Sequence, residues 1–254
     1  MGVIWVQKYE KSRQKKTIFA ASKNRTKKMA KIERTPLKER PFPEYTEKEE
    51  KLNSLSHAVG AVLAVGMMAI AVVASLRNPS RLVLFSSLVY TASVLAMFVI
   101  SSIYHGLPKG MPKQVMRVVD HCNIFLTIAG TYTPIMLIGV LPLNPTMAWS
   151  IFAVEWVCAL IGILLNAIDL KKYARFSMGC YLAMGWCVIV SLRDTITGLT
   201  WPGFAYILAG GIAYTIGAVL YGVGKRKPYR HFVFHIFVVI AAVVQFIGIW
   251  KYLL

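Results

Sequence analysis

The sequence has few acidic residues and few charged residues of either sign. Of 254 residues, 11 are Asp or Glu and 29 are Lys or Arg, and charged residues make up 16% of the chain. Soluble domains carry about a quarter charged residues. The low charge, with a hydrophobic content of 56%, excludes an ordinary soluble globular domain. The net charge of +18 invites a nucleic-acid interpretation, but the basic residues lie in the first part of the chain and in short clusters between long apolar runs, which excludes most DNA-binding modules.

Cysteines are also scarce, and their spacing matches no metal site. The chain has four of them, all inside apolar segments and without a Cys-x2-Cys pair. This placement is typical of small core residues rather than of a disulfide framework or a cysteine metal site.

The basic residues concentrate at the start of the chain. Fifteen of the 29 lie in the first 51 positions, together with seven acidic residues and a proline-containing run at 36–43. Such a composition does not support a packed core. We therefore expect residues 1–48 to form a basic, largely disordered cytoplasmic tail and residues 49–254 to form the folded domain.

Long apolar runs dominate the rest of the sequence. Each is long enough to cross a bilayer as a helix, which takes about 20 residues, and the alternating pattern of barrel strands is absent. We therefore predict an all-α membrane protein, a bundle of seven transmembrane helices joined by short loops. The predicted spans are Ser56–Leu76, Leu82–Ile103, Val118–Val140, Met147–Asn166, Phe176–Leu192, Pro202–Val223 and His231–Tyr252.

The basic residues also orient this bundle. With the N-terminus in the cytoplasm, 25 of the 29 Lys and Arg residues fall on the cytoplasmic side. Cytoplasmic loops of membrane proteins carry such an excess. We therefore expect a multi-pass protein of the cell membrane with a cytoplasmic N-terminus and an external C-terminus.

All the histidines fall at span ends that share the cytoplasmic side in this topology. Imidazole and carboxylate groups near the hydrocarbon region are costly, so each marks a candidate functional site. Four separate parts of the sequence thus bring polar groups to one depth. These groups are His57, His105, Asp120, His121, His231 and His235.

Two of the histidines have the spacing of metal ligands. His231 and His235 lie four residues apart, so their rings project from one helix face, as in zinc metalloproteases. With His105 they offer three neutral imidazoles, and a catalytic zinc keeps three protein ligands and an open water position. A histidine at a membrane interface can equally be a headgroup contact. The grouping of several at one depth favours the metal site.

Further polar residues repeat this spacing and complete a recognisable motif set. The set is Glu50-x2-Asn53-x3-His57, Ser101-x3-His105, Asp120 and His231-x3-His235. With these motifs, residues 45–254 resemble the hemolysin III family, the bacterial branch of the progestin and adipoQ receptor (PAQR) family. That family is similar to the alkaline ceramidases within a wider group of seven-helix hydrolases.

The resemblance implies an intramembrane zinc site near the cytoplasmic face. It implies His105, His231 and His235 as ligands, Asp120 as the residue that holds the water on the metal, and Ser101 as an oxyanion donor or a support behind the ligands. The residues that it implies to line or brace the site are Glu50, Asn53 and His57.

Three other polar residues have no such motif role. Arg117 precedes Asp120 by three residues and is either its ion-pair partner or a headgroup anchor. His121 points about 100° round the helix from Asp120, which favours a supporting role or an interface contact. Glu155 lies in mid-span, where its function is open.

Three functions are compatible with these residues. The first is a zinc-dependent hydrolase of a lipid amide or ester that contributes to membrane-lipid homeostasis, with membrane lipids or a free fatty acid as partners. The second is a lipid-sensing receptor with structural zinc. The third is a haemolytic pore, which is disfavoured because the polar residues gather at one end of the bundle. Nucleic acid is not an expected partner.

Overall fold

A computed structural model describes residues 35–223 and 227–254. The compact unit that carries the helices is Leu37–Leu254, and it begins earlier than the expected boundary at residue 49. Most of the expected disordered tail, residues 1–34, lies outside the described residues.

The expected all-α fold is confirmed, and the described residues contain no strand. Two of the shorter elements, η1 and η3, are 3-10 helices, and η2 is π-helical. In chain order the elements are η1 Leu37–Glu39, α2 Glu47–Leu76, α3 Arg81–Gly106, α4 Met111–Pro134, η2 Ile135–Val140, α5 Pro145–Gly185, η3 Cys187–Ser191, α6 Leu192–Val223 and α7 Arg230–Leu253.

The helix starts follow from local chemistry. Thr46 and Glu49 form a capping box at the start of α2, in which each side chain binds the other residue's backbone N–H. At α5, the Asn144 side chain accepts a hydrogen bond from the Met147 N–H, and Pro145 occupies the first helical position. The polar residues that flank the apolar runs therefore fix where two of the long helices begin.

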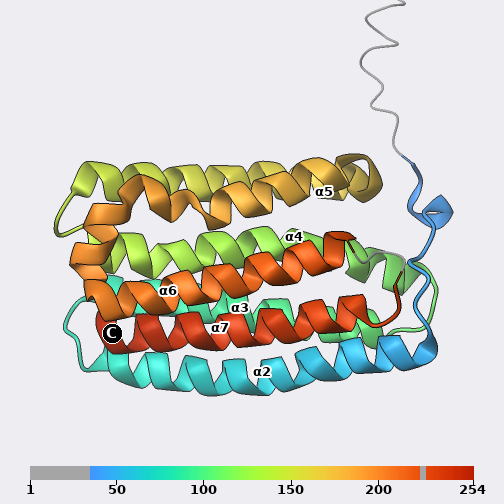
Figure 1. The fold of residues 1–254 in the computed structure, drawn as a ribbon, viewed down its shortest axis with the longest axis horizontal. Coiled ribbons are helices and arrows are strands. Elements are labelled where there is room, and N and C mark those ends of the chain that lie inside the picture. The colour runs from blue at the N-terminus through green and yellow to red at the C-terminus, as the bar shows by residue number, and fades with distance from the viewer. Residues whose placement is uncertain (1–34, 224–226) are drawn as a thin grey trace, which may run out of the picture. The chain divides into compact units, whose positions relative to one another are not determined.

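Five helical runs of the described chain are long and apolar enough to cross a membrane. The fourth of them, Pro145–Gly222, contains 78 residues and is not straight. Asp169 in α5 (φ −157°, ψ 98°) and Thr200 in α6 (φ 63°, ψ 165°) have non-helical backbones. Figure 1 shows the chain reversing within α5, so this run consists of consecutive legs rather than one rod.

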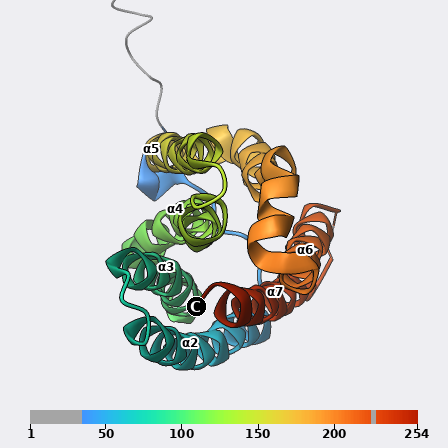
Figure 2. The same cartoon turned by 90° about the vertical axis from the view of Figure 1, so that its left-hand side faces the viewer.

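The run that contains α4 is the most buried of the five. The apolar window of the run Met111–Val140 is 78% buried, whereas the other four windows are 28–44% buried. Seen end-on in Figure 2, α2, α3, α4 and α5 follow one another, and α6 and α7 return the chain to α2. Many large apolar side chains of α2 and α5 face outward, as expected for a lipid-facing surface.

One end of the bundle collects the polar residues. The starts of α2, α4 and α7 and the end of α3 meet there, at the right of Figure 1, while the C-terminus lies at the other end. The expected grouping of the histidines at one level follows from this arrangement of helix ends.

Candidate metal centre

Three histidines from two helices converge at this end. His105 occupies the last turn of α3, and His231 and His235 occupy the first two turns of α7. The Nε2 atom of His231 lies 3.2 Å from that of His105 and 3.1 Å from that of His235. One ligand atom from each residue lies within 4.8 Å of the other two. The structure thus brings together the three predicted ligands.

The donor set fits Zn²⁺. A tetrahedral zinc with Zn–N bonds of about 2.0–2.1 Å needs nitrogen atoms about 3.3 Å apart, close to the two shorter separations. The opposite ring atom, Nδ1, is tied to oxygen in two of the three histidines, which directs their Nε2 atoms to the centre. Such oxygen partners are the usual means of fixing a metal-binding imidazole.

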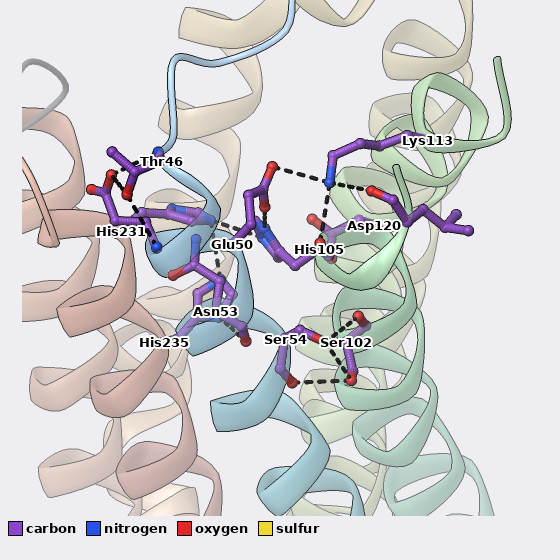
Figure 3. A network of polar contacts seen from close by, with 12 residues as sticks. Thr46, Glu50, Asn53, Ser54, Ser102, His105, Lys113, Asp120, His231 and His235 are labelled. Carbon is purple, nitrogen blue, oxygen red and sulfur yellow. Dashed lines mark hydrogen bonds and ion pairs between the residues drawn. The ribbon is translucent and has the colours of Figure 1, made fainter. Parts of the chain in front are cut away.

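A carboxylate and a lysine hold His105. Glu50 Oε2 lies 2.5 Å from His105 Nδ1, and its other oxygen lies 3.0 Å from Lys113 Nζ. Lys113 also donates to the carbonyl oxygens of His105 and Leu107, at 3.1 and 2.8 Å. Figure 3 shows Glu50 reaching both partners. Glu50 therefore lies where it can brace His105, as predicted for it. Lys113 is a second partner of Glu50, which the sequence did not reveal.

The start of α2 holds His235. Its Nδ1 lies 3.2 Å from the Asn53 backbone oxygen and 3.3 Å from Ser56 Oγ. The Asn53 amide is fully buried, and neither of its polar atoms has a hydrogen-bond partner among the described residues. Asn53 therefore supports the site through its backbone, while its side chain lies beside His235 (Figure 3).

The segment Leu37–Tyr45, which we call the strap, covers the histidines. The Tyr45 ring stacks on the His231 ring, with centroids 5.0 Å apart and planes 11° apart. Burial raises the pKa of the Tyr45 hydroxyl above its usual value. The residue therefore stays neutral at physiological pH. Tyr45 precedes a helix and belongs to no pair at helical spacing, so the sequence did not point to it.

Hydrogen bonds anchor the strap to the bundle. Arg40 donates to the Ile168 carbonyl at 2.9 Å, at the bend of α5, and Gln114 donates to the Arg40 carbonyl at 2.5 Å. Arg117 Nη1 donates to the Pro41 carbonyl at 2.8 Å. The described residues contain no Arg117–Asp120 ion pair within 4.0 Å. Arg117 therefore contacts the strap instead of Asp120, and the predicted contact with a headgroup stays a prediction.

The histidine group borders an internal cavity of about 180 Å³. Asp120 and Ser101 line this cavity together with His231 and His235. Figure 3 shows Asp120 on α4 at the same end of the bundle as the histidines. The two predicted catalytic residues therefore face the space next to the candidate metal ligands.

His121 has a supporting position. Its Nδ1 lies 2.9 Å from the Arg117 carbonyl, one turn earlier on α4, and 3.6 Å from Asp120 Oδ2. The His121 carbonyl in turn accepts a hydrogen bond from Tyr181 at 2.8 Å. These contacts link α4 to the second leg of α5 beside Asp120.

The rest of the cavity is mainly apolar and runs inward between five helices. These walls come from α3, α4, the second leg of α5, α6 and α7, and His57 of α2 also lines the cavity. Apolar and aromatic lining residues include Met97, Ile124, Ile128, Met178, Leu182, Trp186, Tyr214, Phe234 and Val238. A chain of methylene groups suits such a space, with its polar end at the histidines.

Comparison with known proteins gives the family of this chain. Residues 45–246 match the family model described as "Haemolysin-III related". Hemolysin-3 of Bacillus cereus is 30% identical over 207 residues, which cover 82% of this chain and 93% of that protein. The Hemolysin-3 homolog of Bacillus subtilis (strain 168) is 29% identical over 208 residues, with 82% and 96% covered.

A more distant similarity reaches animal proteins. Monocyte to macrophage differentiation factor of Homo sapiens is 30% identical over 176 residues, which cover 65% of this chain and 69% of that protein. Apolar helices long enough to span a bilayer and the family match over most of the chain point to the same conclusion. The chain is a multi-pass membrane protein and belongs to the haemolysin-III related family.

Proposed function

We propose that this protein is a zinc-dependent hydrolase of a lipid amide or ester in the cell membrane. The observation that carries the proposal is the convergence of three histidine Nε2 atoms beside a mainly apolar cavity whose wall includes Asp120 and Ser101. By changing the acyl lipids around it, such an enzyme would contribute to membrane-lipid homeostasis.

The proposal includes a seven-span topology with a cytoplasmic N-terminus. The non-helical backbones at Asp169 and Thr200 support dividing the long run Pro145–Gly222 into three spans, because they separate legs of membrane-crossing length. The bias of 25 of 29 basic residues toward one side supports the orientation. The histidines then lie near the cytoplasmic face.

His105, His231 and His235 would hold the zinc ion. When bound, zinc lowers the pKa of water and polarises a carbonyl group. Asp120 is the candidate general base that takes a proton from the attacking water. Ser101 is the candidate donor to the oxygen that gains negative charge. Both side chains face the cavity, which supports these assignments.

The cavity supports an acyl lipid as the substrate. A fatty chain would lie along Met97, Ile128 and Val238, and its carbonyl carbon would lie beside Asp120 and Ser101. Addition of water and cleavage of the C–N or C–O bond there would yield a free fatty acid in the cavity and an amine or alcohol that takes up the proton. A receptor that senses lipids would use the same pocket but would release its ligand unchanged.

Metal analysis and product release test the proposal. Wild-type protein purified in detergent should carry stoichiometric zinc, and His235→Ala should lose it. Incubation with lipid amides should release fatty acid, and Asp120→Asn should abolish the release. Asp194→Asn is the matched control, because Asp194 lies at the other end of the bundle with the Asn144 amide. Zinc-free wild-type protein, or unchanged zinc in His235→Ala, contradicts the proposal, and lipid binding without turnover favours the sensor.

A further inference from the structure

His57 is a buried polar residue that is not one of the candidate metal ligands. It lies on α2 with 3% of its surface exposed, and it lines the cavity. Its ring stacks on His235 with a centroid distance of 3.7 Å, and its edge faces Phe98 at 5.2 Å. His57 is not part of the group of three histidines whose ligand atoms converge.

Both ring nitrogens of His57 lack hydrogen-bond partners among the described residues. The His235 backbone lies near the ring, but outside hydrogen-bonding geometry. A buried polar atom without a partner costs about 1–3 kcal/mol. The ring contacts with His235 and Phe98 require no nitrogen atom. The imidazole is therefore costly for stability, which favours a function in contact with a ligand.

Several other polar side chains of the cavity have hydrogen-bond partners within the protein. Thr127 and Thr131 donate to carbonyl oxygens of their own helix, at 3.0 and 2.8 Å. Trp186 donates to Thr215 at 3.1 Å, and Gln245 donates to the Ile207 carbonyl at 3.3 Å. Each of these groups is satisfied within the protein, whereas the imidazole of His57 is free to bind a molecule in the cavity.

We propose that His57 hydrogen-bonds the carbonyl or carboxyl oxygen at the head of an acyl chain in the cavity. This inference rests on the proposed function, since it deepens the account of the same substrate site. A neutral imidazole carries one N–H donor, and stacking on His235 against Phe98 holds the ring in place. His57 is thus a positioning residue that brings the head of the chain to Asp120 and Ser101.

Binding of three probes with one chain length tests the assignment. Oleic acid and oleamide each carry a carbonyl oxygen, and 1-octadecene carries none, so their affinity ratios isolate the contribution of the head. The acid stands for a released product and the amide for an intact substrate. Fluorescence of Trp186, which lines the cavity, reports binding in zinc-loaded and chelator-treated wild-type protein. The chelated sample removes any preference that is due to the metal.

Three variants separate the hydrogen bond from packing. His57→Phe keeps an aromatic ring against His235 and removes both nitrogens. His57→Leu also removes both nitrogens and is smaller, so it serves as the test if Phe at this position crowds Phe98. His57→Gln restores a donor. Thr131→Val is the matched control, because it removes a cavity hydroxyl that its own helix already satisfies.

In chelated protein, we expect His57→Phe to lower the preference for oleamide over octadecene about tenfold, the contribution of one buried hydrogen bond. His57→Gln should restore part of it, and Thr131→Val should leave it unchanged. Zinc content should be retained in His57→Phe, and thermal stability without ligand should be equal or higher, because a buried group without a partner is removed. An unchanged preference, or loss of zinc, overturns the inference. If the preference for oleamide depends on His57 but no fatty acid is released from lipid amides, only the proposed hydrolase activity is contradicted.

Discussion

At the scale of single residues, the candidate metal centre depends on side chains that are not themselves candidate ligands. Glu50 is the clearest case, since its two oxygens contact His105 and Lys113. A carboxylate behind a metal-binding imidazole fixes the ring and raises its basicity. The affinity of the centre for zinc should therefore depend on Glu50 nearly as strongly as on a ligand.

Replacement of Glu50 tests this dependence. In Glu50→Gln, loss of the negative charge should weaken zinc binding about 10- to 100-fold while the helices stay intact. Competition with a chelator of known affinity measures the effect. Glu47→Gln is the control, because Glu47 is 84% exposed and pairs with Lys51 on the surface of the same helix. Equal zinc affinity in the two variants would show that Glu50 does not support the site.

The three histidines could be predicted as metal ligands from the sequence alone, because helical spacing and the ends of apolar spans can be recognised in it. Lys113 and Tyr45 could not be predicted in the same way. Lys113 reaches Glu50 across two helices, and Tyr45 meets His231 only because the strap folds over the site. Contacts of this kind depend on packing between elements, to which a single sequence gives no direct access.

At the scale of elements, the bend of α5 shows why one predicted connection was too long. We expected a connection of several residues between the spans Met147–Asn166 and Phe176–Leu192, since lysines and an arginine interrupt the apolar pattern. In the structure the helix resumes directly after Asp169, because its carboxylate accepts from the N–H groups of Lys171 and Lys172, both at 3.1 Å. A capping side chain replaces the loop.

The strap is the element that closes the metal centre. Tyr45→Ala removes the ring that stacks on His231 and should open a path for water and chelators. We expect zinc release to a chelator to become several-fold faster. Tyr45→Phe keeps the ring and should release zinc at the wild-type rate, since the raised pKa of Tyr45 keeps its hydroxyl neutral. The same slow release in all three proteins would mean that the strap does not control access.

Close packing of helices depends on particular glycines. A Cβ added at Gly198 in α6 would collide with the backbone of Gly139 in η2, whereas one added at Gly66 in α2 meets no atom within 4 Å. Gly198→Ala should therefore destabilise the protein by about 1–3 kcal/mol. Gly66→Ala should be neutral or stabilising by up to about 1 kcal/mol. Thermal unfolding in detergent compares them, and equal midpoints would contradict the close contact of α6 with η2.

At the scale of the whole molecule, most basic residues of the described chain and the polar residues of the site lie toward the same end of the bundle. The excess of Lys and Arg marks the proposed cytoplasmic side, and the histidines, Glu50 and Asp120 gather at the matching end of the helices. The basic composition therefore concerns orientation and attraction to anionic headgroups. In the proposed hydrolase, the head of a substrate would then meet the site near the cytoplasmic leaflet.

Site-specific labelling of the intact cell tests this orientation and the number of spans together. Single cysteines are introduced at Lys109, Lys172, Asn78 and Leu143 after the four native cysteines, which lie within the helices, are replaced. With seven spans, Asn78 and Leu143 should react with a membrane-impermeant maleimide from outside. Lys109 and Lys172 should react only after lysis, because the turn before α4 and the bend of α5 then face the cytoplasm.

External labelling at Lys172 would place that bend outside and contradict the division of α5 into two spans. External labelling at Lys109 would reverse the bundle and move the candidate metal centre to the outer face.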